Sequence, residues 1–389
     1  MNDSLRSIAF VLQWHPDCVV GGAETQSWLI AKELVFRGWK VSYISEWPHK
    51  RSYPKVIDGI RLFRLPYRRS EFTYLNFFHL LRVMSGMKAN LYYQRVVNAY
   101  TGMVVKNSHL LGAKSVWACS SILDCEKNRL RMMWENNHDL RRWSRRLFKL
   151  PFICLVDRIS EYGILNVDQI IVQSQEQNVA LSKNWGRESM VVPNAHPVKS
   201  INIEKSTPPE IIWLGSIKPI KRPLMFVDLA RRCNDINAHF IMAGAPTDRV
   251  LSNELSNRLS TTPNVTYLGL ISSAEANKLI ERASLLVNTS SNEGFPNTFI
   301  QAWLRSTPVI SLEVDPDRVI NRNSLGTCSG NFDKLVADVK NLLANPFMLK
   351  NFGKICRNYA FREHNLNRVM NIYEELFLGL LDHDMEIKE

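Results

Sequence analysis

Apolar and polar positions follow one repeated order along the chain: a short apolar run, a polar loop, and then apolar residues at helical spacing. The short runs predict buried strands and the spaced positions predict helices. In the first half, strands are predicted at 8–12, 41–45, 91–94, 116–119, 170–172 and 190–192, with two short strands around Asp58-Gly59. Helices are predicted at 23–36, near 99–111 and just before Trp185-Gly186.

The same order returns after a segment of linker composition that runs from Pro193 to Pro209. Strands are predicted there at 211–214, 239–242, 265–268, 285–287 and 309–312. Helices are predicted at 223–232, 273–282 and 298–304, and roughly at 332–345, 347–361 and 365–381. Two such series predict an α/β chain with two parallel-sheet domains that face each other across a cleft.

Bulk properties narrow the class of protein. A chain of 389 residues is too long for one small core, which agrees with two domains. No apolar run approaches about 18 residues, so no transmembrane helix is predicted, and the apolar segment at 8–12 is too short for a signal peptide. Seven cysteines without a C-x-x-C pair favour free thiols and a cytoplasmic location.

The net charge of +12 lies entirely in the first half of the chain. Residues 1–200 hold 28 Lys and Arg against 16 Asp and Glu, whereas residues 201–389 hold 21 of each. The excess is concentrated at 127–149, where Arg141, Arg142, Arg145 and Arg146 share one side of a predicted helix with interleaved aromatic residues. Such a helix suits an anionic membrane surface; the alternative is a solvated basic helix whose aromatic face packs into the core. A nucleic-acid partner is not expected, because no binding motif accompanies the charge.

The stretch 285–303, LLVNTSSNEGFPNTFIQAW, is the most informative in the chain. An apolar strand ends, the polar run 289–292 makes a loop, and Pro296 suits the first turn of the helix that follows. The first amide groups of a helix are free to bind phosphate. Glu293 and Gln301, about two helical turns apart, can aim polar atoms at one ligand. The plain alternative is an ordinary strand–helix loop.

Two further loops follow predicted strands and are expected to lie beside this one. Lys218, Lys221 and Arg222 lie in the loop 215–222, and Gly244 opens the loop 244–248. Ligands bind open α/β sheets at the carboxyl ends of the strands. Cations beside helix amides indicate a diphosphate site; a solvated basic loop is the alternative.

Three segments of this chain resemble glycosyltransferase family 4. They are Gly21-Gly22-Ala23-Glu24-Thr25, the segment 215–223 (GSIKPIKRP) and Glu293-Gly294-Phe295-Pro296-Asn297. The resemblance spans nearly the whole chain and implies the GT-B fold. It places an acceptor-binding Rossmann-like domain at 1–196, a nucleotide-sugar-binding domain at 197–364, and a helical segment at 365–389 that returns toward the first domain.

The resemblance also implies the activity: a retaining transfer of sugar from a nucleotide diphosphate sugar, with no metal and no other cofactor. The acceptor would be a glycan or a lipid-linked sugar of bacterial-type polysaccharide or lipopolysaccharide synthesis. A lipid-linked acceptor, together with the basic helix described above, predicts an enzyme peripheral on the cytoplasmic membrane. Lys221 matches the family's phosphate-binding lysine, and Glu293 matches the first acid of its E-x7-E motif, which contacts the donor sugar. The implied donor-binding set is Gly22, Gly215, Ser216, Lys218, Lys221, Arg222, Gly244, Glu293, Gly294, Phe295, Pro296, Asn297 and Gln301.

This sequence departs from the family pattern at three places. Gln301 stands where the family has its second acid, and Ser216 stands where an arginine is usual. A histidine common after the strand at 116–119 is missing; Asp124 lies nearby and is the third expected catalytic residue, with Glu293 and Lys221. The departures motivate a rival hypothesis, a GT-B partner or binding subunit with weak or no catalysis.

Overall fold

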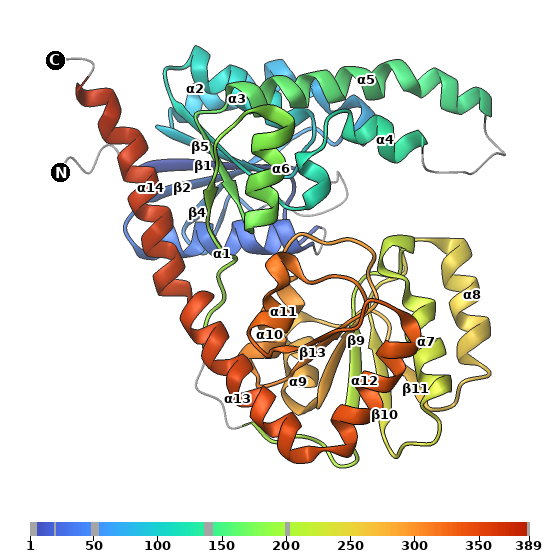
Figure 1. Cartoon of the computed structure of the whole chain (residues 1–389). Coiled ribbons are helices and arrows are strands. Elements are labelled where there is room, and N and C mark those ends of the chain that lie inside the picture. Colours follow the sequence, from blue (N-terminus) through green and yellow to red (C-terminus); the bar gives the residue numbers. More distant parts are fainter. Residues whose placement is uncertain (1–5, 19–20, 48–53, 136–142, 199–202, 387–389) are drawn as a thin grey trace. The chain divides into compact units, whose positions relative to one another are not determined.

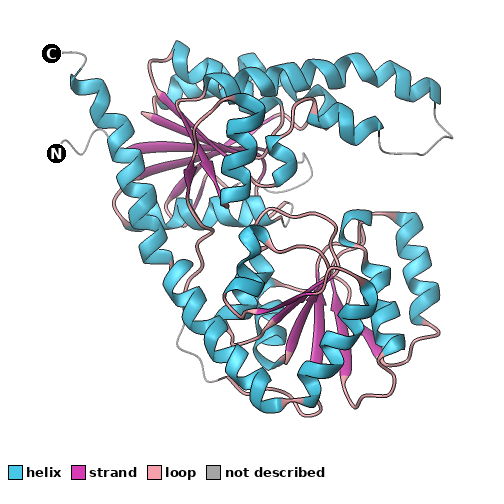
Figure 2. Cartoon of the chain, viewed as in Figure 1, coloured by secondary structure: helices cyan, strands magenta, loops and turns pink. Residues whose placement is uncertain are grey.

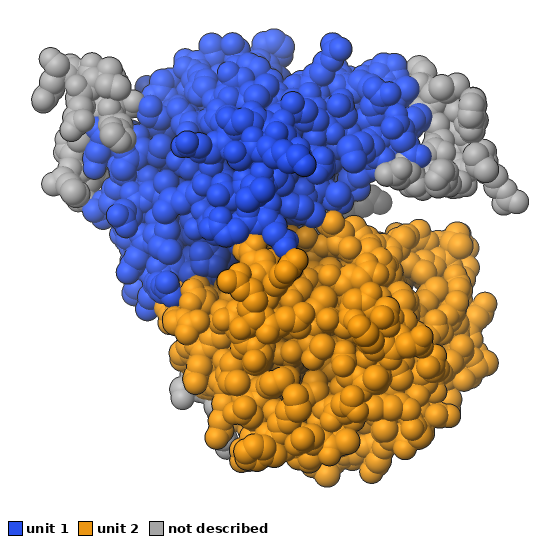
Figure 3. Space-filling view, in the orientation of Figure 1, with its two compact units in different colours: residues 1–195, 367–389 blue, residues 196–366 orange. Residues whose placement is uncertain are grey.

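The computed structural model describes residues 6–18, 21–47, 54–135, 143–198 and 203–386. The chain divides into two compact units (Figure 3), which are described separately. Unit 1 comprises residues 1–195 and 367–389, and unit 2 comprises residues 196–366. The sequence placed the corresponding boundaries at 196/197 and 364/365.

Unit 1 is built on an eight-stranded sheet in the order β3-β4-β2-β1-β5-β6-β7-β8. All neighbouring strands are parallel except β3 and β4, which form an antiparallel hairpin. The strands are β1 (Ser7–Trp14), β2 (Lys40–Glu46), β3 (Val56–Ile57), β4 (Ile60–Leu65), β5 (Leu91–Arg95), β6 (Lys114–Ala118), β7 (Gln169–Val172) and β8 (Met190–Val191). The central strand β1 is buried on both faces, with Ile8 to Leu12 at most 1% exposed, as expected for a parallel sheet covered by helices.

Helices cover this sheet (Figure 1). They are α1 (Gly22–Phe36), η1 (Ser70–Asn76), α2 (Phe77–Met87), α3 (Ala99–Leu110), η2 (Ile122–Cys125), α4 (Arg129–Glu135), α5 (Trp143–Asn166) and α6 (Gln175–Trp185). Gly102 of α3 and Gly163 of α5 let these two helices approach closely, because a Cβ at Gly102 would lie 1.9 Å from the carbonyl oxygen of Ile159. None of the described helices is long and apolar enough to cross a membrane.

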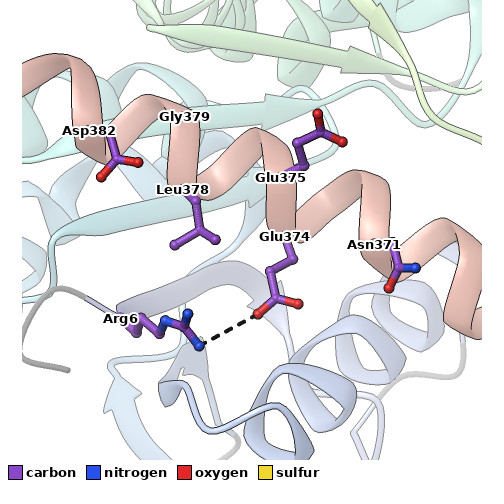
Figure 4. A pocket seen from close by; sticks show the side chains of 7 residues that line it. All are labelled: Arg6, Asn371, Glu374, Glu375, Leu378, Gly379 and Asp382. Carbon is purple, nitrogen blue, oxygen red and sulfur yellow. Dashed lines mark ion pairs between the residues drawn. The ribbon is translucent and has the colours of Figure 1, made fainter. Parts of the chain in front are cut away.

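Helix α14 (Leu366–Glu386) is the last helix of the described chain (Figure 2), and from Asn367 on it belongs to unit 1. Glu374 accepts hydrogen bonds from Trp39 Nε1 at 3.1 Å and from Arg37 at 2.9 Å. A surface pocket of about 700 Å³ lies beside α14, and in Figure 4 Glu374 faces Arg6 within it while Glu375 points away. None of the predicted donor-binding residues lines this pocket.

Unit 2 holds a six-stranded, fully parallel sheet in the order β11-β10-β9-β12-β13-β14. Its strands are β9 (Glu210–Leu214), β10 (His239–Ala243), β11 (Val265–Tyr267), β12 (Leu285–Asn288), β13 (Val309–Ser311) and β14 (Gly326–Cys328). Its helices are η4 (Pro219–Lys221), α7 (Pro223–Arg232), α8 (Arg249–Leu259), α9 (Ser273–Arg282), α10 (Asn297–Leu304), η5 (Pro316–Arg318), α11 (Val319–Arg322), α12 (Phe332–Ala344) and α13 (Pro346–Glu363).

Successive residues of β9 pack on opposite faces of this sheet. Ile211 and Trp213 belong to a core with residues of α7 and α12, whereas Ile212 belongs to a second core with residues of α9, α10 and α13. This alternation is what a strand buried between two helical layers requires. The predicted fold class, an α/β chain with two Rossmann-like parallel-sheet domains, is confirmed.

Three differences from the predicted elements concern the site and its surroundings. Helix α10 begins at Asn297, and Pro296 precedes it in an extended conformation instead of lying in the first turn. The helices α2 and α8 and the strand β14 were not predicted. Helix α5 extends from Trp143 to Asn166 and contains Pro151. It therefore continues well beyond the basic segment 127–149, in which it begins.

Candidate functional site

Three loops meet at the carboxyl edge of the unit 2 sheet. Strands β10, β9 and β12 are adjacent and parallel, so the loops 215–222, 244–248 and 289–297 leave the sheet at the same edge. The amide of Ile217 donates to the carbonyl oxygen of Ala245 at 2.8 Å, and the amide of Ser291 donates to Ile220 at 2.9 Å. The loops that the sequence singled out are therefore bonded to one another.

The centre of this edge is an ion pair between two predicted site residues. The ammonium group of Lys221 donates a hydrogen bond to Oε1 of Glu293. The same carboxylate oxygen accepts a hydrogen bond from the hydroxyl of Ser290 at 2.8 Å. Their side chains are 21% and 15% exposed, so both reach the surface. A basic group and an acidic group thus stand side by side at the mouth of the three loops.

Thr289 fixes the two loops that carry this pair. Its hydroxyl donates to the carbonyl oxygen of Lys221 at 2.7 Å and accepts from Nε1 of Trp213 at 2.9 Å. Thr289 is fully buried and Trp213 is nearly so. Buried polar groups need such partners, and here the partners hold the backbone of Lys221 against the loop that carries Glu293. The sequence predicts only a loop at Thr289 and Ser290; their position between the strand and Glu293 is the signal that could have indicated a role.

Glycine is required where the first two loops cross. Gly244 has φ of +156°, and a Cβ there would lie 1.7 Å from the carbonyl oxygen of Gly215. Only a residue without a side chain allows the two backbones to approach this closely. This close approach fixes how the two loops cross; the roles of Gly215 and Gly244 in donor binding stay predictions.

Helix α10 points its amino end at the same edge. Phe295 is 7% exposed and packs against Trp303 and His364, with ring centroids 6.1 and 5.1 Å away. This buried contact of Phe295 fixes the turn that leads from Gly294 through Pro296 into the helix. The first amides of a helix have no intrahelical acceptor, and together they attract anions. The E-G-F-P-N segment thus combines a carboxylate, an apolar anchor and a helix N-terminus.

His196, which sequence reasoning did not select, contacts this helix start. Its Nε2 lies 3.4 Å from Oδ1 of Asn297. Its backbone is bonded to the end of α13, since its amide donates to the carbonyl oxygen of His364 and its own carbonyl accepts from Leu366. Burial, and next the nearby charge of His364, lower the pKa of His196 to about 3. The ring is therefore neutral near pH 7 and able to orient the Asn297 side chain.

The remaining predicted residues of unit 2 lie around this centre. Arg222 opens α7 in a left-handed conformation and forms two hydrogen bonds with Glu313, at 2.7 and 2.8 Å. These bonds raise the pKa of Arg222. Lys218 is exposed, and Ser216 and Gln301 are half-buried. Their roles at the donor stay predictions.

The residues predicted in unit 1 have different surroundings. Gly22 begins α1 and is exposed. Asp124 is fully buried; its Oδ2 accepts from the amides of Ser120 and Ser121, and its Oδ1 pairs with Arg129 at 3.1 Å. These contacts explain Asp124 as a structural residue of the loop after β6, and its catalytic role stays a prediction.

The predicted membrane-contact residues are only partly covered. Arg141 and Arg142 lie outside the described residues, and Arg145 and Arg146 lie in the first turn of α5. Among the described residues, no group of three or more His, Cys, Asp or Glu side chains could hold a metal ion.

Residues 208–345 match the model of the family described as Glycosyl transferases group 1. The chain is 21% identical over 172 residues to glycosyltransferase 1 domain-containing protein 1 of Xenopus tropicalis, an alignment that covers 43% of this chain and 50% of that protein. The chain thus spans about half the length of the curated relatives it matches.

Solved structures resemble the whole chain. Sucrose-phosphate synthase from Thermosynechococcus elongatus superposes with a TM-score of 0.75 at 15% identity, over 97% of this chain and 100% of that one. Anabaena HepE in complex with UDP and glucose gives 0.73 at 15% identity, over 96% and 100%. The chain therefore has the two-domain GT-B fold, and the match to the group 1 family model covers residues 208–345 of it.

Proposed function

We propose that this chain is a glycosyltransferase that moves a sugar from a nucleotide diphosphate sugar to an acceptor hydroxyl. The observation that carries the proposal is the edge of unit 2 where Lys221, Glu293 and the N-terminus of α10 converge. The match of residues 208–345 to the group 1 family supports the same activity. The diphosphate would lie at the helix N-terminus, with Lys221 as its charged partner.

The reaction breaks the bond between the anomeric carbon of the sugar and the diphosphate oxygen. Negative charge grows on the leaving diphosphate as that bond breaks, and fixed donors at this position lower the barrier. Lys221 and the amides of Phe295, Asn297 and Thr298 are such donors. The acceptor hydroxyl oxygen bonds to the anomeric carbon, and its proton passes to the leaving phosphate, so no strong protein base is needed.

Glu293 would contact the donor sugar once the diphosphate engages Lys221. In the present arrangement each group neutralises the other. A diphosphate gives Lys221 a second anionic partner and leaves the Glu293 carboxylate available to sugar hydroxyls, with Ser290 still bonded to it. We further propose that transfer retains the anomeric configuration and needs no metal ion.

The acceptor is proposed to be a glycan or a lipid-linked sugar of polysaccharide or lipopolysaccharide synthesis, reached at the cytoplasmic membrane. The basic segment 127–149 supports an anionic membrane partner, with eight Lys and Arg against two acidic residues.

A GT-B subunit without catalysis is the alternative. It is favoured by Gln301 and Ser216, which stand where the family carries charged side chains, since a neutral amide or hydroxyl bonds a donor more weakly than a charged group does. Such a subunit would bind a nucleotide diphosphate without turning over its sugar.

A panel of nucleotide sugars tests the proposal. Nucleotide release is measured for each donor with the wild-type chain and with Glu293→Ala. We expect the wild-type chain to release nucleotide slowly from one nucleotide sugar, and Glu293→Ala to lose this release. Binding of a nucleotide diphosphate without release from any donor would support the subunit, and neither binding nor release would overturn both.

A further inference from the structure

One face of unit 1 exposes large apolar side chains beside arginines. It comprises the loop between β4 and η1, η1 itself and the outer side of α2. We call it the α2 face, and its residues are Tyr67, Arg68, Arg69, Leu75, Phe78 and Arg82. Phe78 is 79% exposed, Leu75 is 55% exposed and Tyr67 is 47% exposed. A single exposed apolar residue is ordinary; three within twelve positions, between arginines, need an explanation.

The outward direction of these side chains is set by the core. Leu80 and Met84 of α2 are fully buried and pack in one cluster with Leu65 and Tyr92. Residues four apart share one side of a helix, so Leu80 and Met84 define its inner side. Phe78 and Arg82, also four apart, are exposed on the outer side. Helix α2 is therefore amphipathic with an outer face that is apolar at one end and basic at the other.

The loop before η1 is held firmly in place. Asn76 donates from Nδ2 to the carbonyl oxygen of Pro66 at 3.0 Å and to the hydroxyl of Tyr100 at 2.8 Å. The amide of Arg68 donates to the fully buried carboxylate of Glu46 at 3.0 Å. Tyr67, Arg68 and Arg69 are thus displayed by a supported loop beside the start of α2.

The charge of this region is strongly one-sided. Residues 61–90 contain six Lys and Arg and one acid, Glu71. Glu71 pairs with Lys149 of α5 at 2.6 Å, and Phe72 packs on Phe152 with ring centroids 5.2 Å apart. Helix α5 therefore adjoins η1, and the α2 face is continuous with the helix that begins in the basic segment 127–149.

We propose that the α2 face seats unit 1 on an anionic lipid bilayer. Phe78 and Leu75 enter the headgroup region, and Arg68, Arg69 and Arg82 contact lipid phosphates, which is how basic amphipathic helices bind membranes. The proposal rests on the lipid-linked acceptor proposed above and names the surface that brings the enzyme to it. A bilayer fits better than a protein groove because the face combines protruding apolar side chains with a local excess of positive charge, six Lys and Arg against one acid at 61–90.

Vesicle co-sedimentation of the full chain tests this without any donor or acceptor, so its outcome is independent of transferase activity. Vesicles of phosphatidylcholine with phosphatidylglycerol are compared with phosphatidylcholine alone. The test variant is Phe78→Ser with Arg69→Ser and Arg82→Ser. The matched control is Phe347→Ser with Lys350→Ser and Lys354→Ser on α13, where Phe347 is 85% exposed beside two exposed lysines.

Wild type and control are expected to bind the anionic vesicles equally. The α2 variant is expected to bind roughly thirtyfold or more weakly, from two lost charges and one lost apolar anchor. The proposal is overturned if the α2 variant binds as the wild type does, if both variants lose binding equally, if both kinds of vesicle are bound equally, or if the wild-type chain binds neither kind. Thermal unfolding of each variant establishes that the fold is kept.

Discussion

The ammonium group of Lys221 and the carboxylate of Glu293 form an ion pair across two loops, although the residues are 72 positions apart in the chain. The pair joins the loop after β9 to the loop after β12, beside the N-terminus of α10. Since both side chains are partly exposed, each can exchange the other for a ligand group. Under the proposed function, an anion would be received at Lys221 and sugar hydroxyl groups at Glu293.

Removing the lysine should weaken binding of a nucleotide diphosphate more than binding of the nucleoside. Loss of one charge-assisted contact costs about 1.5–3 kcal/mol, or roughly a 10- to 150-fold rise in Kd. We expect this rise in the Kd of the nucleotide diphosphate for Lys221→Ala, measured by calorimetry, with little change in the Kd of the nucleoside. Lys340→Ala is the control, because Lys340 pairs with Asp235 away from the three loops. Equal losses for both ligands would place Lys221 away from the phosphates.

Removing the carboxylate should abolish transfer and leave the fold intact. Glu293→Ala is expected to lower sugar transfer by at least about a hundredfold, the usual effect of deleting a group that acts on the transition state. Glu281→Ala, which breaks an ion pair with Arg305 elsewhere in unit 2, should retain activity. Transfer at the wild-type rate by Glu293→Ala would remove Glu293 from the site.

His196 should make the stability of unit 2 depend on pH. Its folded-state pKa is about 3 and its unfolded-state pKa is about 6.5, so the unfolded chain binds the extra proton between these values. Stability is therefore full above about pH 6.5 and falls as the pH drops toward 3, by up to about 1.4 kcal/mol for each unit. Urea unfolding across this range should give a flatter profile for His196→Asn.

The control for that profile is His239→Asn, because His239 is an exposed residue at the start of β10. A pH profile of His196→Asn that matches those of the control and the wild type would contradict the assignment of a neutral, buried imidazole.

Gly244→Ala should destabilise unit 2 more than Gly269→Ala does. Both glycines have positive φ, which costs an alanine about 1–2 kcal/mol. A Cβ at Gly269 meets nothing within 4 Å, whereas one at Gly244 overlaps the backbone of Gly215. The forced shift adds about 1–3 kcal/mol, measured as the free energy of unfolding in urea. Equal costs for the two variants would show that the two loops do not need their close approach.

Much of the fold could be read from the sequence because its signals are local. Pro223 predicted the start of α7, and the apolar run at 285–287 predicted β12, since a buried parallel strand is a continuous apolar segment. Helix α2 was missed although Leu80 and Met84 have helical spacing; its exposed Phe78 and its Gly86 obscure the pattern. Helix α5 passes through Pro151, a residue that sequence rules place at helix boundaries.

The site was only partly predictable because its key contacts join distant residues. Lys221 and Glu293 were selected one by one from their loops, but their ion pair depends on the adjacency of β9 and β12. The support from Thr289 and Trp213 depends on the same adjacency. His196 meets Asn297 only because the linker and the end of α13 come together, which no local pattern of one sequence encodes.

The most direct test of the central claim is a crystal structure of the chain with the nucleotide sugar that the donor panel selects. We expect the diphosphate at the amino end of α10, with a phosphate oxygen about 3 Å from Nζ of Lys221 and the sugar hydroxyls at Glu293. Diphosphate density elsewhere, with the Lys221–Glu293 ion pair unbroken, would contradict the central claim.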